Sequence, residues 1–341
     1  MGQGTTAAIG RARAAGLSLG VILAGVLAML ALAALMIGPY PLSPVEVVAA
    51  LSGAADQQAE IVVWNVRLPR VAAALLVGAA LASAGAAYQA LFRNPLVSPD
   101  ILGVSAGAGL GAVLGIFLSL PIAGIQLAAF AGGLGAVALV WVVASAVRHG
   151  DRTLILVLTG VVVGALAGAA TSLLKVLADP YDQLPAITFW LLGSLASITP
   201  ADVAPAVAPV VLGLAALGLM RWRINVLGMG DEEARALGVE AGRLRLWTVV
   251  AATLVTASVT AIAGVIGWVG LVIPHIGRML VGPGFGRLLP VSAAIGAGYL
   301  LIVDTLARTI AQTEVPLGIL TAVIGAPFFI WLLARGRRGW S

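Results

Sequence analysis

Long apolar runs separated by short polar or charged turns dominate the chain from residue 16 onward. The hydrocarbon core of a bilayer is about 30 Å thick, so a spanning helix needs about 20 mostly apolar residues. The pattern predicts ten spans, at residues 16–37, 68–91, 99–119, 123–147, 153–176, 202–221, 246–267, 271–283, 288–308 and 316–335. The segment 271–283 is short and interrupted by Pro274, and such a broken helix needs protein or a water-filled cavity around it. We therefore predict an all-α polytopic membrane protein that forms one transmembrane domain over residues 1–341, with nine spans as the alternative count.

Composition supports a membrane setting. Hydrophobic residues make up 61% of the chain and charged residues 10%, whereas soluble domains carry about 25% charged residues. The mean hydropathy of +1.09 leaves too little polar surface to cover a water-soluble protein of 341 residues. The absence of cysteine excludes disulfides, thiolate metal sites and cysteine nucleophiles.

The arginines predict the orientation. If residue 1 is cytoplasmic, ten spans place both termini inside, and 15 of the 19 Lys and Arg residues then face the cytoplasm. These 15 are Arg11, Arg13, Arg93, Arg148, Arg152, Arg221, Arg223, Arg235, Arg243, Arg245, Arg278, Arg287, Arg335, Arg337 and Arg338. Arg67, Arg70, Lys175 and Arg308 fall outside, a split that obeys the positive-inside rule.

The first apolar run is longer than that of a signal peptide and lacks a convincing cleavage site, so we interpret it as a retained helix.

Five spans before about residue 200 and five after it would give two halves of opposite orientation, as in many transporters built from inverted repeats. The two halves show no convincing sequence identity, so this symmetry is a hypothesis about the fold alone.

Two series of glycines repeat every four residues, which places each series on one helix face. They are Gly103, Gly107, Gly111 and Gly115, and Gly160, Gly164 and Gly168. This spacing lets helix backbones approach closely in lipid. The alternative is that a glycine face lines a wide pathway for a bulky solute, and the sequence does not separate the two.

Three arginines at the outer face form a second candidate feature. Arg67 and Arg70 begin one span, and Arg308 ends another, one turn after Asp304. Such residues can be interfacial anchors, and Asp304 is well spaced to pair with Arg308. Because positive charge on the outer side is disfavoured, recognition of an acidic partner is the other interpretation.

The longest cytoplasmic loop, at about residues 221–245, carries three acids after Gly230, where they complement a helix dipole. Ala234, Leu237 and Gly238 then form a small apolar edge. This loop is either a solvated connector or a short amphipathic helix that docks into another protein.

Several chemistries find no support in the sequence. There is no P-loop motif, and Lys175 is the only lysine. His149 and His275 share no metal-ligand spacing, and Asp304 is the only acid well inside a span, too little for an ion relay. The basic residues form no continuous face for nucleic acid, and no catalytic constellation is present, so neither a nucleic-acid-binding protein nor an enzyme is predicted.

The chain resembles the permease of bacterial type II ABC importers, the FecCD-type family of iron-chelate, haem and vitamin B12 importers. The likeness rests on RLPRVAAALLVGAALASAGAAYQALFRNPLVSPDILGVSAGAGLG, MGDEEARALGV, GLVIPHIGRML and EVPLGILTAVIGAPFFIWLL. It covers nearly the whole chain after the first helix. The resemblance implies ten helices per subunit and a homodimer that joins two cytoplasmic P-loop ATPase subunits and one periplasmic binding protein. The chain itself then binds no cofactor, because ATP and Mg²⁺ belong to the ATPase.

The resemblance also implies roles for particular residues. Docking of the binding protein falls to Arg67, Arg70 and Arg308, ATPase coupling to Ala234, Leu237 and Gly238, and the cytoplasmic gate to Asn94, Leu96 and Thr153. Leu154 is apolar where some relatives carry a small hydroxyl residue. The segment DPYDQLPAITFWLLGSLASITP would form a short helix and loop at the outer mouth, where Trp190 could instead be an interfacial anchor.

The implied function is import of an iron chelate, haem or a ferric siderophore, across the inner membrane by alternating access. A corrinoid importer of the same family and a secondary transporter that works without ATP are the alternatives. His275 is not assigned as a haem ligand, because its PHI context recurs in the family whatever the cargo.

Overall fold

The computed structural model describes residues 2–147 and 152–335, and every regular element in them is helical. The N-terminal part comprises α1 (Gly2–Met36), α2 (Pro44–Leu51), α3 (Gln57–Ile61), the π-helical turn η1 (Val62–Arg67), α4 (Leu68–Leu91), the 3₁₀ turn η2 (Pro99–Leu102), α5 (Val104–Phe117) and α6 (Ile122–Ala146). The remainder comprises α7 (Arg152–Leu177), α8 (Gln183–Leu192), α9 (Pro200–Leu227), α10 (Asp231–Ala236), α11 (Ala241–Ala263), α12 (Val269–Val281), α13 (Phe285–Ala307) and α14 (Leu317–Arg335).

The predicted fold class is confirmed, since all ten predicted spans are helical. In the described ranges, seven segments are long and apolar enough to cross a membrane, and they fall on α1, the α3–α4 run, α6, α7, α9, α11 and α13. The other three predicted spans are the shorter apolar helices α5, α12 and α14. The segment expected at the outer mouth contains α8. Nothing in this arrangement tests the inverted repeat, which stays a prediction.

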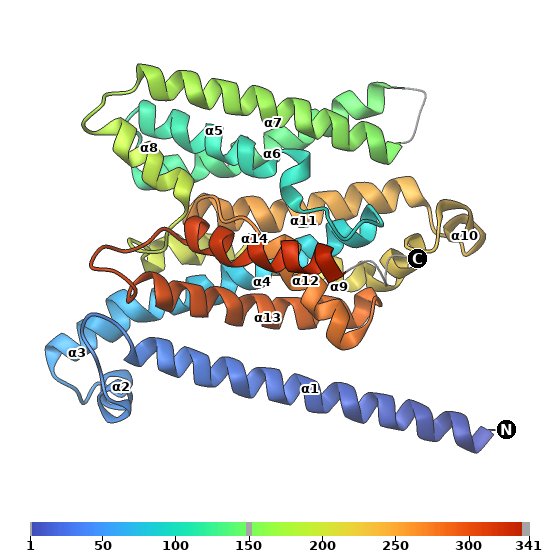
Figure 1. Cartoon of the computed structure of the whole chain (residues 1–341), viewed down its shortest axis with the longest axis horizontal. Coiled ribbons are helices and arrows are strands. Elements are labelled where there is room, and N and C mark those ends of the chain that lie inside the picture. Colours follow the sequence, from blue (N-terminus) through green and yellow to red (C-terminus); the bar gives the residue numbers. More distant parts are fainter. Residues whose placement is uncertain (1, 148–151, 336–341) are drawn as a thin grey trace.

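The long helices run roughly alongside one another, so the bundle has two ends (Figure 1). The start of α1, the end of α14 and α10 lie at one end, which we call the α10 end. The helices α2 and α3 and the loop between α13 and α14 lie at the other, which we call the α2 end. An even number of crossings therefore separates the start of α1 from the end of α14.

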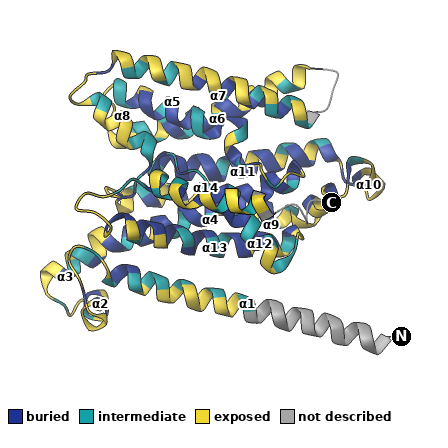
Figure 2. Ribbon diagram, viewed as in Figure 1, coloured by how far each residue is buried: buried dark blue, intermediate teal, exposed yellow. Residues whose placement is uncertain are grey.

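The helix α4 forms the centre of the bundle and is buried over most of its length, as is α11, whereas α1 and α7 expose much of their surface (Figure 2). Alanine and glycine dominate α4, so neighbouring helices can approach its backbone closely. In lipid, where no hydrophobic force drives helices together, such close packing is the main attraction between them.

The glycine series over residues 103–115 packs helices together. A Cβ atom on Gly107 would collide with the carbonyl oxygen of Gly132 on α6, and one on Gly132 would collide with that of Gly107. A Cβ on Gly111 would collide with the carbonyl of Ala128. The second series behaves differently, since Gly160 packs on the backbone of Ile101 but Gly168 faces open space.

The helix α4 meets two neighbours through backbone contacts that the sequence patterns did not single out. Gly78 lies against Gly296 of α13 so closely that neither position has room for a Cβ atom. About two turns further along α4, a Cβ atom on Gly85 would collide with the carbonyl of Gly270 on α12. These contacts fix α12 and α13 on the central helix.

The short helix α12 continues through Pro274 without a break in its helical assignment. Proline has no N–H, so the carbonyl of Gly270 receives no helical hydrogen bond. The side chain of Gln89 on α4 supplies the missing donor, with its Nε2 atom 3.3 Å from the Gly270 oxygen and 3.2 Å from the Leu271 oxygen. A neighbouring helix thereby provides the shelter that a proline at membrane depth requires.

Several boundaries differ from the predicted ones. The helix α9 extends to Leu227 and α11 begins at Ala241, so the loop expected over 221–245 is only about half as long. The span expected at 99–119 starts with the 3₁₀ turn η2, and its α-helix begins only after Gly103, whose φ of +79° is left-handed. Hydrophobicity marks a span, but it does not mark where the helical hydrogen bonds start.

The segment 38–67, which lies between the first two predicted spans, contains α2, α3 and η1. Ser43 and Glu46 form a capping box at the start of α2, with Ser43 N donating to Glu46 Oε2 over 2.7 Å. This hydrogen bonding with Ser43 lowers the pKa of Glu46. The S-x-x-E spacing was a readable signal for this helix.

Candidate docking, coupling and gate sites

The three arginines predicted to dock a binding protein lie together at the α2 end, and all three are buried. Arg67 and Arg70 are each 3% exposed and Arg308 is 6% exposed. Arg67 ends η1, Arg70 lies in the first turn of α4, and Arg308 follows α13. Their guanidinium groups are therefore used inside the protein in this structure.

Arg70 is held by two carboxylates. Its Nε atom donates to Asp304 Oδ1 over 2.8 Å, and its two terminal nitrogens donate to the two oxygens of Glu314 over 2.7 and 2.8 Å. Such a bidentate contact is the strongest hydrogen-bonding geometry between an arginine and a carboxylate. Asp304 is fully buried, whereas the Glu314 side chain is 38% exposed on the loop before α14.

Arg67 and Arg308 hold the end of α1. Arg67 donates to the carbonyl oxygens of Leu35, Met36 and Tyr40, and Arg308 donates to the carbonyl of Ala34 over 2.9 Å. The last carbonyls of a helix have no partner within that helix, so these side chains act as its C-terminal cap. The Nε atom of Arg308 also lies 3.5 Å from Asp304 Oδ2, the i, i+4 pair that the sequence suggested.

The cluster therefore joins α1, α4, α13 and the loop before α14 through three cations and two anions. We call it the arginine cluster, formed by Arg67, Arg70, Arg308, Asp304 and Glu314. Sequence reasoning missed Glu314, although an acid directly before Val315 and Pro316, just ahead of a predicted span, was a visible signal. Docking through these arginines stays a prediction, because nothing in the described structure tests it.

The predicted coupling segment forms a short helix, α10, at the α10 end. Ala234 is fully buried, so it attaches α10 to the bundle. Leu237 is 53% exposed, and Gly238 is exposed with a φ of +75° that favours glycine. The exposed pair Leu237 and Gly238 is thus the part of this segment that a partner could contact.

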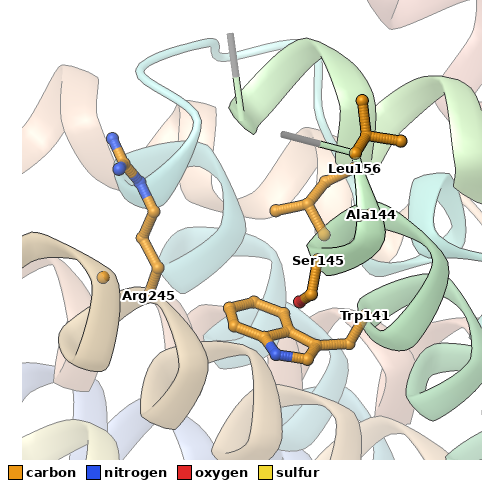
Figure 3. Close-up of a pocket in the computed structure, with 7 residues that line it drawn as sticks. Trp141, Ala144, Ser145, Leu156 and Arg245 are labelled. Atoms are coloured by element: carbon orange, nitrogen blue, oxygen red, sulfur yellow. The ribbon is translucent and has the colours of Figure 1, made fainter. Parts of the chain in front are cut away.

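An ion pair secures α10. The two terminal nitrogens of Arg245 on α11 donate to the two oxygens of Asp231 over 2.9 and 2.7 Å. Arg245 also borders a small pocket lined by Trp141, Ala144, Ser145 and Val147 at the end of α6, by Leu156 of α7 and by Gly242. In Figure 3, Arg245 lies across this pocket from Trp141 and Ser145. One side chain therefore connects α10 with the contact between α11 and α6.

We expect Asp231→Asn to loosen α10. Hydrogen bonds from Arg245 hold the pKa of Asp231 below its usual value. A carboxylate of this kind stabilises the fold above its unfolded-state pKa and loses that effect as the pH falls through the lowered value. Hydrogen exchange of the α10 amides should therefore quicken about fivefold in the variant, a loss of about 1 kcal/mol.

The matched control for Asp231→Asn is Glu232→Gln, because Glu232 is exposed on the same short helix. In the wild type, protection of α10 should be constant between pH 6 and 8 and should fall only below about pH 4. Equal exchange rates in the two variants would show that the Arg245 pair does not hold α10.

The predicted gate residues lie at the α10 end. Asn94 is exposed between α4 and η2, and its Oδ1 atom accepts the N–H of Leu96 over 2.9 Å, which shapes the turn. Leu96 is 41% exposed, and Thr153 lies half-buried in the first turn of α7. Asn94 and Pro95 also line an open cavity of about 500 Å³ with Arg93, Arg278, Asn225 and Met229. The gate assignment itself stays a prediction.

Other candidate residues add no site. His149 lies outside the described residues, as do Arg148, Arg337 and Arg338. In the ranges 2–147 and 152–335, no group of three or more His, Cys, Asp and Glu side chains is arranged to hold a metal ion.

Comparison with known proteins gives consistent matches over most of the chain. The model of the FecCD transport family matches residues 26–335. The molybdate import permease MolB of Haemophilus influenzae is 40% identical over 285 residues, covering 83% of this chain and 84% of the relative. The cobalamin import permease BtuC of Halobacterium salinarum is 43% identical over 296 residues (86% and 79%), and the hemin transport permease HmuU of Yersinia pestis is 39% identical over 284 residues (81% and 84%).

One solved structure has the same fold and a similar level of sequence identity. It is a metal-chelate type ABC transporter in an inward-facing conformation, 38% identical to this chain with a TM-score of 0.86, and the match covers 93% of this chain and 99% of that one.

Proposed function

Because the chain belongs to the FecCD transport family, we propose that it imports an iron chelate, either haem or a ferric siderophore, as the permease subunit of an ABC importer. Members of this family are transport subunits rather than enzymes, and ATP hydrolysis belongs to a separate subunit. The observation that carries the proposal is the family match, which extends over residues 26–335 and so over nine of the ten predicted spans in full.

The names of the relatives agree on the class of transporter but differ in the transported compound. Similar permeases are named for hemin, for iron chelatin in Helicobacter pylori and for Fe(3+)-citrate in Bacillus subtilis, which supports an iron chelate. Others are named for cobalamin and molybdate. A corrinoid is therefore the second candidate cargo, and a secondary transporter is not favoured.

Transport by reconstituted proteoliposomes that contain the complete transporter is the direct test of the cargo. A ferric siderophore, haem, a corrinoid and molybdate should be offered at equal concentration. ATP-dependent uptake of an iron chelate supports the proposal, and uptake of only the corrinoid or only molybdate contradicts it while leaving the permease assignment intact.

We propose the assembly that the family implies. Two copies of this chain pair and join two cytoplasmic P-loop ATPase subunits, which bind ATP and Mg²⁺, and one periplasmic binding protein. The α10 end faces the cytoplasm, a choice supported by the 15 basic residues that the ten-span topology places there. The exposed pair Leu237 and Gly238 then contacts the ATPase, and the two access states alternate as the ATPases close and open.

Docking of the binding protein at the arginine cluster requires a change in that cluster, since its guanidiniums are buried. Glu314 is the member that can move, because it is the only partly exposed carboxylate on Arg70 and lies in a loop. Its removal would leave three cations against Asp304 alone. We propose that a carboxylate of the binding protein takes the place of Glu314 on Arg70.

This exchange predicts that Glu314→Gln binds the partner more tightly. The variant removes an internal competitor worth about 1 kcal/mol for a partly exposed pair, so the Kd should fall about fivefold. The measurement is titration of the transporter in nanodiscs with the loaded binding protein. Glu60→Gln is the control, because it removes a carboxylate at the same end without contacting Arg70.

Amide variants of the partner's acidic residues separate the two parts of the docking proposal. If these variants bind as well as the wild-type partner, docking through the arginines is wrong. If they bind more weakly but Glu314→Gln has no effect, docking stands and the exchange is wrong. Charge reversal at Arg67 is a poor test, because it would also remove the cap of α1.

A further inference from the structure

A lateral groove lies between α6 and α9 on the outer-facing half of the bundle that the proposed topology assigns. Both helices pack on α11, which forms the floor with Ser258, Ala261 and Ile262. The walls are Ala123, Gln126, Leu127 and Phe130 of α6, and Asp202, Pro205, Ala206 and Pro209 of α9. The groove has a volume of about 420 Å³ and is mostly apolar.

One carboxylate stands at the α2 end of this groove. Gln126 Nε2 donates to Asp202 Oδ1 over 2.7 Å and so bridges the two walls. The backbone N–H and the hydroxyl of Thr199 donate to Asp202 Oδ2 over 2.8 and 2.6 Å. All three donors are neutral, and in the described part of the chain no Lys, Arg or His nitrogen lies within 4 Å of Asp202. Asp202 thus belongs to the capping box of α9, and it puts a carboxylate with no cationic side chain of the described residues beside it at the outer end of the groove.

Two prolines add hydrogen-bond acceptors to the same wall. Pro205 and Pro209 lie inside α9, and neither has an N–H to donate. The carbonyls of Ala201 and Pro205, which precede them by four residues, consequently receive no helical hydrogen bond. Carbonyls that lack their i+4 donor, beside a carboxylate, favour a ligand with a cationic group that is rich in N–H donors.

We propose that this groove binds a phospholipid with a primary ammonium head group, that is, a phosphatidylethanolamine. The ammonium donates to Asp202 and to the α9 carbonyls that lack an i+4 donor, and one acyl chain lies along the floor on α11. The dimensions agree, because the rise of seven residue steps from Asp202 to Pro209 is about 10 Å along the helix, within one leaflet. This inference rests on the membrane setting and does not depend on the cargo.

The head group can be tested without any mutation. Native mass spectrometry of the intact transporter complex should follow retention of phosphatidylethanolamine, its N-methyl and N,N-dimethyl derivatives and phosphatidylcholine, all with the same acyl chains. We expect retention to fall at each methylation, because each step removes one N–H donor, with about fivefold between the two ends of the series. Equal retention across the series would overturn the proposal.

Two variants locate the site. Asp202→Asn keeps an acceptor for Thr199 and removes the charge, so it should abolish the preference for phosphatidylethanolamine. Asp182→Asn is the control, since Asp182 is an exposed carboxylate at the same end. Ala123→Trp places a large ring at an exposed wall position and should lower retention of every lipid. A preference that survives both Asp202→Asn and Ala123→Trp would overturn the assignment, as would crosslinking of the groove to a basic protein segment instead of lipid.

Discussion

Replacing Arg70 with methionine should lower the free energy of unfolding by about 3–5 kcal/mol, the cost of removing one partner from a buried ion pair. Methionine retains much of the side chain's volume, so the loss would come from charge. Asp304 is fully buried, and without Arg70 its nearest cationic atom in the described structure is the Nε of Arg308, 3.5 Å from Oδ2. Thermal unfolding of the detergent-solubilised permease should show the change directly.

The double variant Arg70→Met with Asp304→Asn separates charge from packing. Because it removes the stranded carboxylate, it should recover a substantial part of the lost stability. Arg243→Met is the surface control, since the Arg243–Glu240 pair is mostly exposed and such pairs contribute about 0–1 kcal/mol. If Arg70→Met and Arg243→Met unfold at the same temperature, the arginine cluster does not stabilise the bundle.

Gly78→Leu should lower the free energy of unfolding by about 3 kcal/mol, the upper end of the usual cost of overpacking, and should leave little folded protein in the membrane fraction. The new side chain would meet the backbone of Gly296, which cannot rotate away as a side chain could. Separation of α4 from α13 would follow. Size-exclusion profiles and thermal unfolding of the variant would measure the effect.

Gly218→Leu on α9 is the matched control for Gly78→Leu, because a Cβ atom at Gly218 has no neighbour within 4 Å. It introduces the same side chain into a long apolar helix. We expect wild-type yield and unfolding temperature for Gly218→Leu. A similar loss in both variants would mean that leucine disturbs these helices without regard to the backbone contact.

The sequence predicted the ten helices well, because a bilayer demands a fixed length of apolar residues whatever lies beside them. It also indicated the short helix α12 and the interaction of Asp304 with Arg308, which is local. Periodicity further restricted the glycines of α5 to one face, and helix packing in lipid gave that face a physical meaning.

The contacts of the arginine cluster could not be predicted from the sequence, for a physical reason. Arg70 meets Asp304 and Glu314 across 234 and 244 residues of chain, so no local spacing marks these pairs. The same is true of Gln89, which supplies the donor that Pro274 denies to Gly270. The sequence also could not show that these arginines are buried, since arginines at the end of a span can face water or can cap a neighbouring helix.

The backbone contacts of Gly78 with Gly296 and of Gly107 with Gly132 have a consequence for motion. No layer of side chains separates these helices, so neither pair can slide or tilt internally without first coming apart. We expect α4 with α13, and α5 with α6, to move as two rigid bodies when the permease changes its direction of access. The hinge would then fall in connections such as residues 264–268 between α11 and α12, where Gly264 and Trp268 already have positive φ angles.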